Sequence, residues 1–396
     1  MLKFIYLFYI ICFFSIVKSF YRYFKVKKFL SKEIKIKNEE YNKKIEIIIP
    51  VYYEEEKVEE SIVYFMQFVD ICNVNYVTTS REIGNGTYHK ILELIKKYGT
   101  KNIFVYNCPN LKGVMAHQIN YVARKMNDDA IIGVYNVDSF PDSRSFEYVI
   151  DKIEDKMIFQ QISYFDDKKL GILNSAQKWQ NRWSLIYEMG KCLEHKNFNN
   201  FMYTIGHGIF IKKRTLAELG YWSEIFINED NELGYRATCN GVKIYSIPYL
   251  EKCGFAKDIK IYIKQQSVWY NGPLYAFSYI KRLTIKNVWY ACLNFKAALS
   301  WLLGPIITFL IILFDLLSKN YFDLMLLIFL LFIYISVINQ LVENILDKLD
   351  YVKRKKMNFI LTDITFYFIH AIGPILTLIK CILNKNTQEN KYKTEK

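Results

Sequence analysis

Two adjacent carboxylates, Glu229 and Asp230, stand directly ahead of a short segment whose composition favours a helix. A carboxylate held at the start of a helix can take a proton from a hydroxyl group that attacks as a nucleophile. The charge of Glu229 would tend to raise the pKa of Asp230. Glu-Asp pairs also serve as helix caps and first-turn charges, so the pair indicates a general base only if other chemistry-bearing residues accompany it.

A candidate metal ligand, Asp138, follows an apolar run at 131–135 that predicts a buried strand. Oxygen ligands at the end of a strand suit Mg²⁺ or Mn²⁺, which keeps waters and shares the oxygens of a diphosphate. An aspartate shortly before Pro141 is also a common turn residue. The pattern therefore leaves two alternatives, a metal site at Asp138 with Asn136 beside it, or a structural turn.

Two further junctions ahead of helical stretches offer places for a nucleotide. Residues 50–54 end an apolar run and begin a helical stretch, so Pro50, Tyr52 and Glu54 are candidates to contact a base and ribose. Glu54 could equally be a first-turn charge. Lys112 stands on a glycine turn ahead of a second helical stretch, where a cation and free backbone N–H groups suit a phosphate. A solvated lysine is the alternative there.

A histidine between two glycines and a Gln-Trp pair lie on either side of the carboxylate pair. Trp269 could stack on the face of a sugar while Gln265 hydrogen-bonds its hydroxyl groups. A tryptophan beside a membrane is also a common interfacial anchor. The molecule that carries the attacking hydroxyl group is the acceptor. The candidate acceptor-binding residues are Gly206, His207, Gly208, Gln265 and Trp269.

Short apolar runs alternate with helical stretches from Ile45 to Cys253. Such alternation predicts an α/β fold with a parallel sheet, in which ligands sit at the carboxyl ends of the strands. The predicted strands are residues 45–49, 74–78, 103–106 and 131–135, and the predicted helices are residues 54–72 and 114–126.

Apolar runs outside this region predict membrane helices. Residues 4–17 form an uncleaved N-terminal anchor that is short for a span. The C-terminal spans are predicted at 297–314 and 324–338, with a weaker one at 359–382. Basic residues flank these runs and mark the cytoplasmic side. We therefore expect a multi-pass protein of the cell membrane with a cytoplasmic α/β domain.

The composition agrees with a soluble domain joined to membrane segments, because hydrophobic residues reach 52% while charged residues still make up 23%. A net charge of +14 could serve nucleic acid, but the basic residues form no nucleic-acid-binding motif, so we expect no nucleic-acid partner. The 8 cysteines are scattered, without CxxC or Cys/His ligand spacing, so we expect no structural zinc.

The order of these motifs resembles that of the membrane-bound family 2 glycosyltransferases, the group that includes cellulose and hyaluronan synthases. The resemblance covers roughly residues 44–273 and the layout of the flanking helices. The matching segments are 50–54 for Pro-x-Tyr-Asn-Glu, 112–113 for the lysine-glycine phosphate element, 136–138 for DxD, 228–230 for TED and 265–269 for QxxRW.

Several positions depart from that pattern. Tyr53 replaces an asparagine, and Asn136 replaces the first aspartate of DxD. Val268 replaces the arginine of QxxRW, a cation that would grip a diphosphate or an acceptor. The early acidic motif is TTSRE at 78–82, in which Glu82 is the candidate nucleotide-binding carboxylate.

The resemblance implies a GT-A fold with a Rossmann-like, mostly parallel sheet, a nucleotide-diphospho-sugar donor, an inverting reaction and a glycan or lipid-linked acceptor. It assigns the base to Asp230 and the Mg²⁺ or Mn²⁺ to Asp138. The expected organisation is an N-terminal anchor with its basic flank at 1–28, a cytoplasmic GT-A domain at 33–273, an amphipathic interface segment at 274–296, a transmembrane region of two to three spans at 297–382 and a polar tail at 383–396.

Two other classes of protein stay open. The losses at Asn136 and Val268 favour a catalytically inert scaffold or binding subunit of a polysaccharide-synthesis complex, whereas the intact carboxylates favour an enzyme. Asp363 and His370 lie in an apolar segment, as in a transporter. The large α/β domain and the small number of spans argue against transport.

Overall fold

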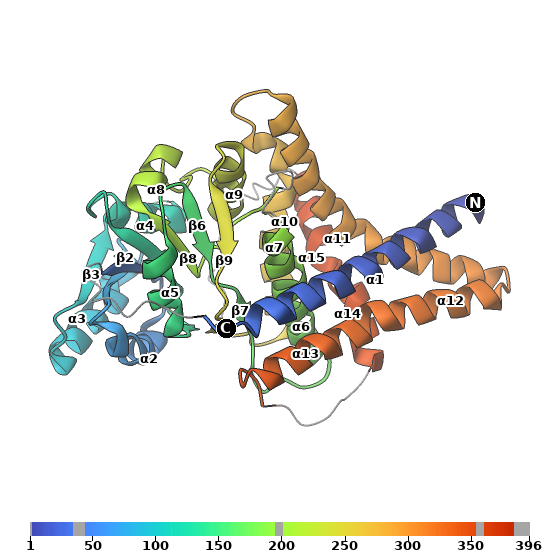
Figure 1. The fold of residues 1–396 in the computed structure, drawn as a ribbon, viewed down its shortest axis with the longest axis horizontal. Helices are drawn as coiled ribbons and strands as arrows, with labels where there is room; N and C mark the ends of the chain where they lie inside the picture. The colour runs from blue at the N-terminus through green and yellow to red at the C-terminus, as the bar shows by residue number, and fades with distance from the viewer. Residues whose placement is uncertain (1, 35–43, 112, 195–200, 354–359, 384–396) are drawn as a thin grey trace.

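The chain forms an α/β unit at one end and a group of long apolar helices at the other, with shorter helices between them (Figure 1). The computed structural model that shows this arrangement describes residues 2–34, 44–111, 113–194, 201–353 and 360–383.

The α/β unit is built on a seven-stranded sheet. Its strands are β1 (Ile45–Pro50), β2 (Cys72–Thr79), β3 (Ile103–Cys108), β4 (Ile131–Val134), β6 (Met157–Gln160), β8 (Ile209–Lys212) and β9 (Lys243–Ser246), in the order β3-β2-β1-β4-β8-β6-β9. The first four are parallel to one another, and β8 runs antiparallel to β4 and β6. The predicted α/β fold with a mostly parallel sheet is confirmed.

A second, three-stranded sheet has the order β5-β10-β7, with β5 at Ser139–Pro141, β10 at Glu251–Cys253 and β7 at Ser163–Tyr164. Because β5 follows β4 and β7 follows β6 after a few residues, this small sheet stands at the carboxyl ends of those two strands. It frames the edge where an α/β sheet binds its ligands.

Alternation along β1 separates two hydrophobic cores, as expected for a strand buried on both faces. Ile47 and Ile49 face the core shared with α2 (Glu55–Phe65), α3 (Gly86–Tyr98) and α5 (Arg144–Lys152). Ile48 faces the opposite core. The helices that pack there are α4 (Met115–Ala123), α8 (Lys213–Leu219) and α9 (Glu229–Cys239).

Both helices predicted in the α/β region are shorter than expected. The predicted helix 54–72 ends as α2 at Phe65 and is followed by a 3-10 turn, η1 (Met66–Phe68). Cys72, the last residue of the predicted helix, is instead the first residue of β2 and pairs with Ile45 of β1. The helix must therefore end before this strand begins. The predicted helix 114–126 is α4, Met115–Ala123.

A layer of helices separates the sheet from the apolar helices (Figure 1). It contains α6 (Gly171–Arg182), the π-helical η3 (Trp183–Met189), α7 (Gly190–Glu194) and α10 (Ile259–Leu274). The carboxylate of Asp258 caps α10 by accepting a hydrogen bond from the Ile261 N–H at 2.8 Å.

Four helical stretches are long and apolar enough to cross a membrane: 5–30, 285–317, 321–348 and 361–382. They comprise α1 (Leu2–Leu30), α11 (Ile285–Leu317), then α12 (Tyr321–Phe332), η6 (Ile333–Val337) and α13 (Ile338–Lys348) as one continuous stretch, and finally α14 (Ile360–Ile369) with α15 (Ile372–Ile382). The second half of the predicted interface segment 274–296 forms the first turns of α11, after the short turn η5 (Ala276–Tyr279).

The N-terminal helix is longer than the apolar run that predicts it. It continues past residue 17 to Leu30, and Tyr23, Val26 and Leu30 in this part are buried against the rest of the chain. The Arg22 guanidinium binds the Glu194 carboxylate of α7 at 2.7 Å, with both side chains largely buried. At the other end, Tyr9 donates to Asp315 on α11 at 3.3 Å. The loop at 318–320 lies at that same end, far from the sheet (Figure 1).

The last apolar segment is divided by a turn at His370 and Ala371. Its first part, α14, lies against α6, where Ser175 donates to Thr362 at 3.0 Å. Its second part, α15, lies against α10, where the hydroxyls of Ser267 and Thr377 are 2.9 Å apart. The segment therefore covers both α6 and α10 of the helix layer. Residue 359, its predicted first residue, lies outside the described residues.

Candidate active site

Asp138 lies on the turn between β4 and β5, at the carboxyl end of the parallel strands, and is largely buried. Its Oδ2 is 4.0 Å from Lys57 Nζ, which in turn is 3.9 Å from Glu54 Oε1. A side chain at Gly254 would bring its Cβ within 2.9 Å of Asp138 Oδ2, so the glycine leaves space beside the carboxylate. The space offers one carboxylate, that of Asp138, which is the type of ligand that Mg²⁺ or Mn²⁺ binds together with diphosphate oxygens.

Asn136 stands two residues before Asp138 and faces the neighbouring cavity described below. Its backbone N–H donates to Ser139 Oγ at 3.1 Å, which fixes the turn that carries both side chains. An amide oxygen is a hard but uncharged ligand, so Asn136 would support a cation at Asp138 without adding charge.

The junction between β1 and α2 has an unusual backbone. Tyr53 has φ of 53°, a left-handed conformation that asparagine adopts more readily than tyrosine. Pro50 ends β1 and Glu54 immediately precedes α2. The Arg81 guanidinium lies 4.7 Å from the centre of the Tyr52 ring. The junction thus places an aromatic ring and a cation side by side at the position predicted to contact a nucleotide.

Glu82 is buried and binds backbone on two sides. Its carboxylate accepts hydrogen bonds from the N–H of Tyr53 at 3.2 Å and from the N–H of Thr87 at 2.7 Å. Glu82 therefore holds the junction that carries Tyr53 against the first turn of α3. Lys112, the candidate phosphate ligand, lies outside the described residues.

Asp230 occupies the first turn of α9, where its Oδ1 accepts a hydrogen bond from the Asn231 N–H at 2.8 Å. The helix can approach the segment at 203–206 closely because residue 234 is glycine. A Cβ there would lie 2.4 Å from Thr204 N. Gly206 in turn faces Asp230, since a Cβ on Gly206 would lie 3.3 Å from Asp230 Oδ2. Two glycines thus set the position of the candidate base.

A cavity of about 360 Å³ opens beside Asp230. The predicted site residues that line it are Asn136, Gly206, His207, Glu229, Asp230, Gln265 and Trp269. The predicted residues that do not line it are Pro50, Tyr52, Glu54, Glu82, Asp138 and Gly208. The structure therefore brings the base candidates, most acceptor candidates and Asn136 together in one cavity, whereas the other described nucleotide candidates do not line it.

One face of α10 forms part of the cavity wall. Gln265 is buried there, whereas Trp269, one turn further along, is 40% exposed. Val268, which stands where the family has an arginine, also faces the cavity. An apolar side chain thus replaces a cation at this wall.

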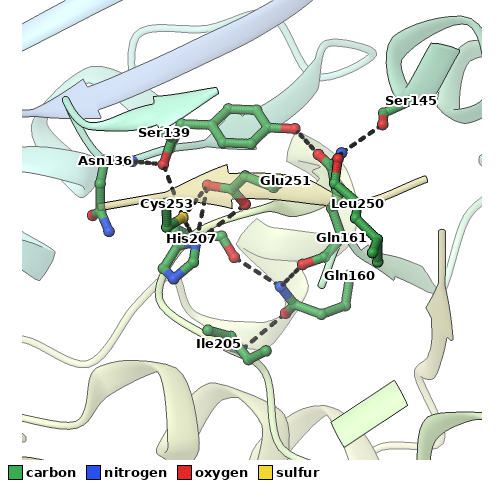
Figure 2. A network of polar contacts seen from close by, with 11 residues as sticks. Asn136, Ser139, Ser145, Gln160, Gln161, Ile205, His207, Leu250, Glu251 and Cys253 are labelled. Carbon is green, nitrogen blue, oxygen red and sulfur yellow. Dashed lines mark hydrogen bonds and ion pairs between the residues drawn. The ribbon is translucent and has the colours of Figure 1, made fainter. Parts of the chain in front are cut away.

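His207, Glu251 and Cys253 form a compact cluster next to the cavity (Figure 2). His207 Nδ1 is 3.1 Å from both Glu251 oxygens, and Cys253 Sγ is 3.2 Å from Glu251 Oε1. Burial alone would lower the pKa of His207, but Glu251 and Cys253 outweigh it and raise the pKa well above its usual range. The three ligand atoms lie within 4.8 Å of one another and could hold a metal ion.

Two adjacent glutamines connect this cluster to the sheet (Figure 2). The side-chain amide of Gln160 donates to the His207 carbonyl at 2.7 Å, and its oxygen accepts from the Ile205 N–H at 2.9 Å. The side-chain amide of Gln161 donates to Ser145 at 2.6 Å. The glycine-flanked segment around His207 is therefore held rigidly from the end of β6.

Several cavity residues carry no motif that sequence reasoning could use. They are Trp179, Trp183, Glu188, Tyr203 and Trp301. Among them Glu188 is buried on η3 and accepts a hydrogen bond from the Tyr203 hydroxyl at 3.1 Å. Burial raises the pKa of Glu188 to about 7, although hydrogen bonds from Tyr203 and Trp183 oppose the rise. A carboxyl group in the cavity wall is thus partly protonated at neutral pH.

This pKa predicts a pH-dependent stability. Between the ordinary value of 4.5 and about 7, the folded protein holds the Glu188 proton more tightly than the unfolded chain does. Its contribution to the free energy of unfolding therefore falls as pH rises through that window, by on the order of 3 kcal/mol in total. Glu188→Gln lacks this titration. We therefore expect the difference in melting temperature, Glu188→Gln minus wild type, to increase between pH 5 and pH 8. Glu218→Gln, at an exposed position of α8, is the control, and equal pH profiles for the wild type and Glu188→Gln would contradict the assignment.

The mostly parallel sheet, with a small second sheet at the carboxyl ends of β4 and β6, defines the class of fold: it is the GT-A fold of glycosyltransferases. Residues 137–338 match the sequence model described as glycosyl transferase family group 2, and the chain belongs to this family. No curated protein matches the sequence significantly.

Solved structures similar to this chain include a mannosyltransferase. The mannosyltransferase PcManGT from Pyrobaculum calidifontis, in complex with GDP-Man and Mn²⁺, is 12% identical, with a TM-score of 0.59 over 96% of this chain and 100% of that one. TarS residues 1–349 from S. aureus are 12% identical, with a TM-score of 0.46 over 89% of this chain and 99% of that one. The first of these supports the GT-A fold.

Proposed function

We propose that the protein is a membrane-bound inverting glycosyltransferase. It moves a sugar from a nucleotide-diphospho-sugar to a membrane-associated glycan or lipid-linked acceptor, in the synthesis of a surface or envelope polysaccharide. The observation that carries this proposal is the shared cavity, in which Asp230 meets Asn136 of the DxD-like motif and Trp269 of the QxxRW-like motif. The GDP-Man in the similar mannosyltransferase supports a donor of this chemical class.

The reaction is a single displacement at the anomeric carbon. Asp230 takes the proton from the acceptor hydroxyl, whose oxygen then forms the new bond while the bond to the nucleoside diphosphate breaks. Gly206 leaves room beside Asp230 for the approaching hydroxyl group. Asp138 would hold the Mg²⁺ or Mn²⁺, and the bound ion would neutralise negative charge on the departing diphosphate.

The proposal is tested by incubating the purified full-length protein with a panel of nucleotide-diphospho-sugars and divalent cation. We expect slow hydrolysis of one donor, because water can take the place of the acceptor hydroxyl. Hydrolysis should stop when Asp230 is changed to Asn. A protein that hydrolyses none of the donors, or does so equally with and without Asp230, is not the transferase proposed here.

The α/β domain at 33–273 is proposed to be cytoplasmic, with the segment at 297–382 in the membrane and the loop at 318–320 on the outer side. In a background with the exposed Cys292 replaced by serine, we expect Lys319→Cys to react with an impermeant maleimide in intact cells. Glu154→Cys, on the α/β domain, should react only after lysis. Labelling of Glu154→Cys in intact cells would reverse the orientation.

A further inference from the structure

The cavity beside Asp230 extends away from the sheet toward the apolar helices. Its walls come from α6 and η3 on one side and from α10 on another. Trp301 of α11 and His370, at the turn between α14 and α15, close the end nearest the apolar helices. A molecule in this cavity would touch both the base and helices that can cross the membrane.

Aromatic rings dominate the far part of the cavity. Of the 6 tryptophans in the chain, the cavity wall contains Trp179, Trp183, Trp269 and Trp301. The rings of Trp183 and Trp301 are 5.9 Å apart. Flat aromatic faces with a polar edge suit ligands that are apolar on one face and polar at the rim, which is the chemistry of a sugar ring.

Side-chain amides supply the polar contacts between these rings. They are Gln180, Asn228, Asn231, Gln265, Gln266 and Asn294. An amide offers both donors and acceptors, as a hydroxyl group does, so the two pair well. Asn228 Oδ1 is buried and has no hydrogen-bond partner in the described part of the chain. A buried acceptor left unpaired is unfavourable, and a ligand hydroxyl would satisfy it.

The charges disfavour a phosphate as the occupant. The described residues of the cavity wall include no lysine or arginine, and the His207 ring is already paired with the Glu251 carboxylate at 3.1 Å, whereas Glu229 and Asp230 supply carboxylates. A phosphate group is normally bound by arginine or lysine and would be repelled by these carboxylates. Arg182 is adjacent in sequence, but its guanidinium donates to the Tyr334 carbonyl and lies 4.8 Å from the Trp179 ring.

We infer that this cavity binds an uncharged carbohydrate acceptor, and that Glu188 binds one of its hydroxyl groups. The inference rests on the proposed function and narrows it, because a polyprenyl phosphate whose phosphate accepts the sugar would not fit. Glu188 stands on a π-helical segment, a feature frequent at functional sites. Hydrogen bonds with Tyr203 and Trp183 hold its carboxyl group in place at the wall.

The tryptophans provide a readout that needs no donor and no turnover. The full-length protein in lipid nanodiscs is titrated with neutral gluco-, manno- and galacto-configured oligosaccharides of two to four sugars, and separately with farnesyl phosphate and inorganic phosphate. We expect saturable quenching of tryptophan fluorescence by at least one oligosaccharide and no saturable change with either phosphate. Trp289→Phe, at an exposed ring of α11 outside the cavity wall, should keep the response, and Trp183→Phe should reduce it.

Glu188→Gln keeps the shape of the side chain but removes its charge, and should weaken oligosaccharide binding by about tenfold. Quenching by farnesyl phosphate, no response to any oligosaccharide, or an unchanged affinity in Glu188→Gln would overturn the inference. Failure of donor hydrolysis with intact oligosaccharide binding would instead remove the proposed transferase activity, so the two failures are distinguishable.

Discussion

Replacing Asp230 by asparagine should lower the rate of sugar transfer by about two to four orders of magnitude, because asparagine cannot accept the proton of the acceptor hydroxyl. The substitution keeps the size of the side chain. Its amide oxygen can still accept the hydrogen bond from the Asn231 N–H that organises the first turn of α9. Binding of the nucleotide-sugar should therefore stay close to that of the wild type.

Asp258→Asn is the matched control for this experiment. Asp258 also begins a helix and also accepts a backbone N–H, from Ile261, but it is exposed and does not line the cavity. Single-turnover transfer and nucleotide-sugar affinity, measured on both variants and the wild type, separate a chemical effect from a folding effect. Equal loss in both variants would point to folding.

The Asp230→Asn variant also distinguishes an enzyme from an inert scaffold. In a strain that lacks the gene, a scaffold would restore the glycan equally well with either residue at position 230. A catalyst would restore it only with aspartate. Full restoration by Asp230→Asn would therefore refute the catalytic role and leave the scaffold as the better account of the losses at Asn136 and Val268.

The parts of the fold that follow from local sequence are those that the sequence predicts best. The apolar runs of β1 to β4 are short, rich in isoleucine and valine, and separated by helical stretches, so the strands and their parallel arrangement follow from local patterning. The strands β6, β8 and β9 have four residues each, as β4 does, but none of the three is predicted from the sequence. They are defined by pairing with distant neighbours, which periodicity along the chain cannot show.

Non-local contacts also explain the differences in helix length. The apolar run at 4–17 is followed by basic residues, so hydropathy ends the predicted anchor there. In the structure Arg22 binds Glu194, 172 residues away in the sequence, and the helix continues to Leu30. A charge that would end a membrane helix in isolation is compatible with a longer helix when a partner on α7 neutralises it.

The residues of the candidate site also fall into two groups, those that local sequence predicts and those that only non-local contacts bring to the site. The motifs place Asp138 and Asp230 at strand and helix ends, where the structure also has them. Glu188 and the aromatic wall of the cavity lie in a stretch at 171–194 without a motif, and only folding brings them beside Asp230. Cys253 and His207 have no ligand spacing in the sequence because β10 delivers one and the loop before β8 delivers the other.

Replacing Asp138 by alanine should abolish divalent-cation-dependent binding of the nucleotide. Asp138 is the only acidic residue of the DxD-like motif, and its carboxylate lies beside the space left by Gly254. Calorimetric titration of GDP and UDP, with Mn²⁺ and with a chelator, measures the effect. Asp138→Asn keeps the shape in case alanine disturbs the turn, and Asn136→Asp, which adds a second carboxylate, should strengthen the cation dependence.

The cluster of His207, Glu251 and Cys253 is the competing position for the metal, and the choice of ion distinguishes it from Asp138. A thiol and an imidazole favour Zn²⁺, whereas carboxylate and diphosphate oxygens favour Mg²⁺ or Mn²⁺. If Asp138 holds the functional ion, Cys253→Ser should leave nucleotide affinity in Mn²⁺ unchanged while Asp138→Ala removes it. If Asp138→Ala keeps its Mn²⁺-dependent affinity and Cys253→Ser loses it, the functional metal belongs to the cluster of His207, Glu251 and Cys253.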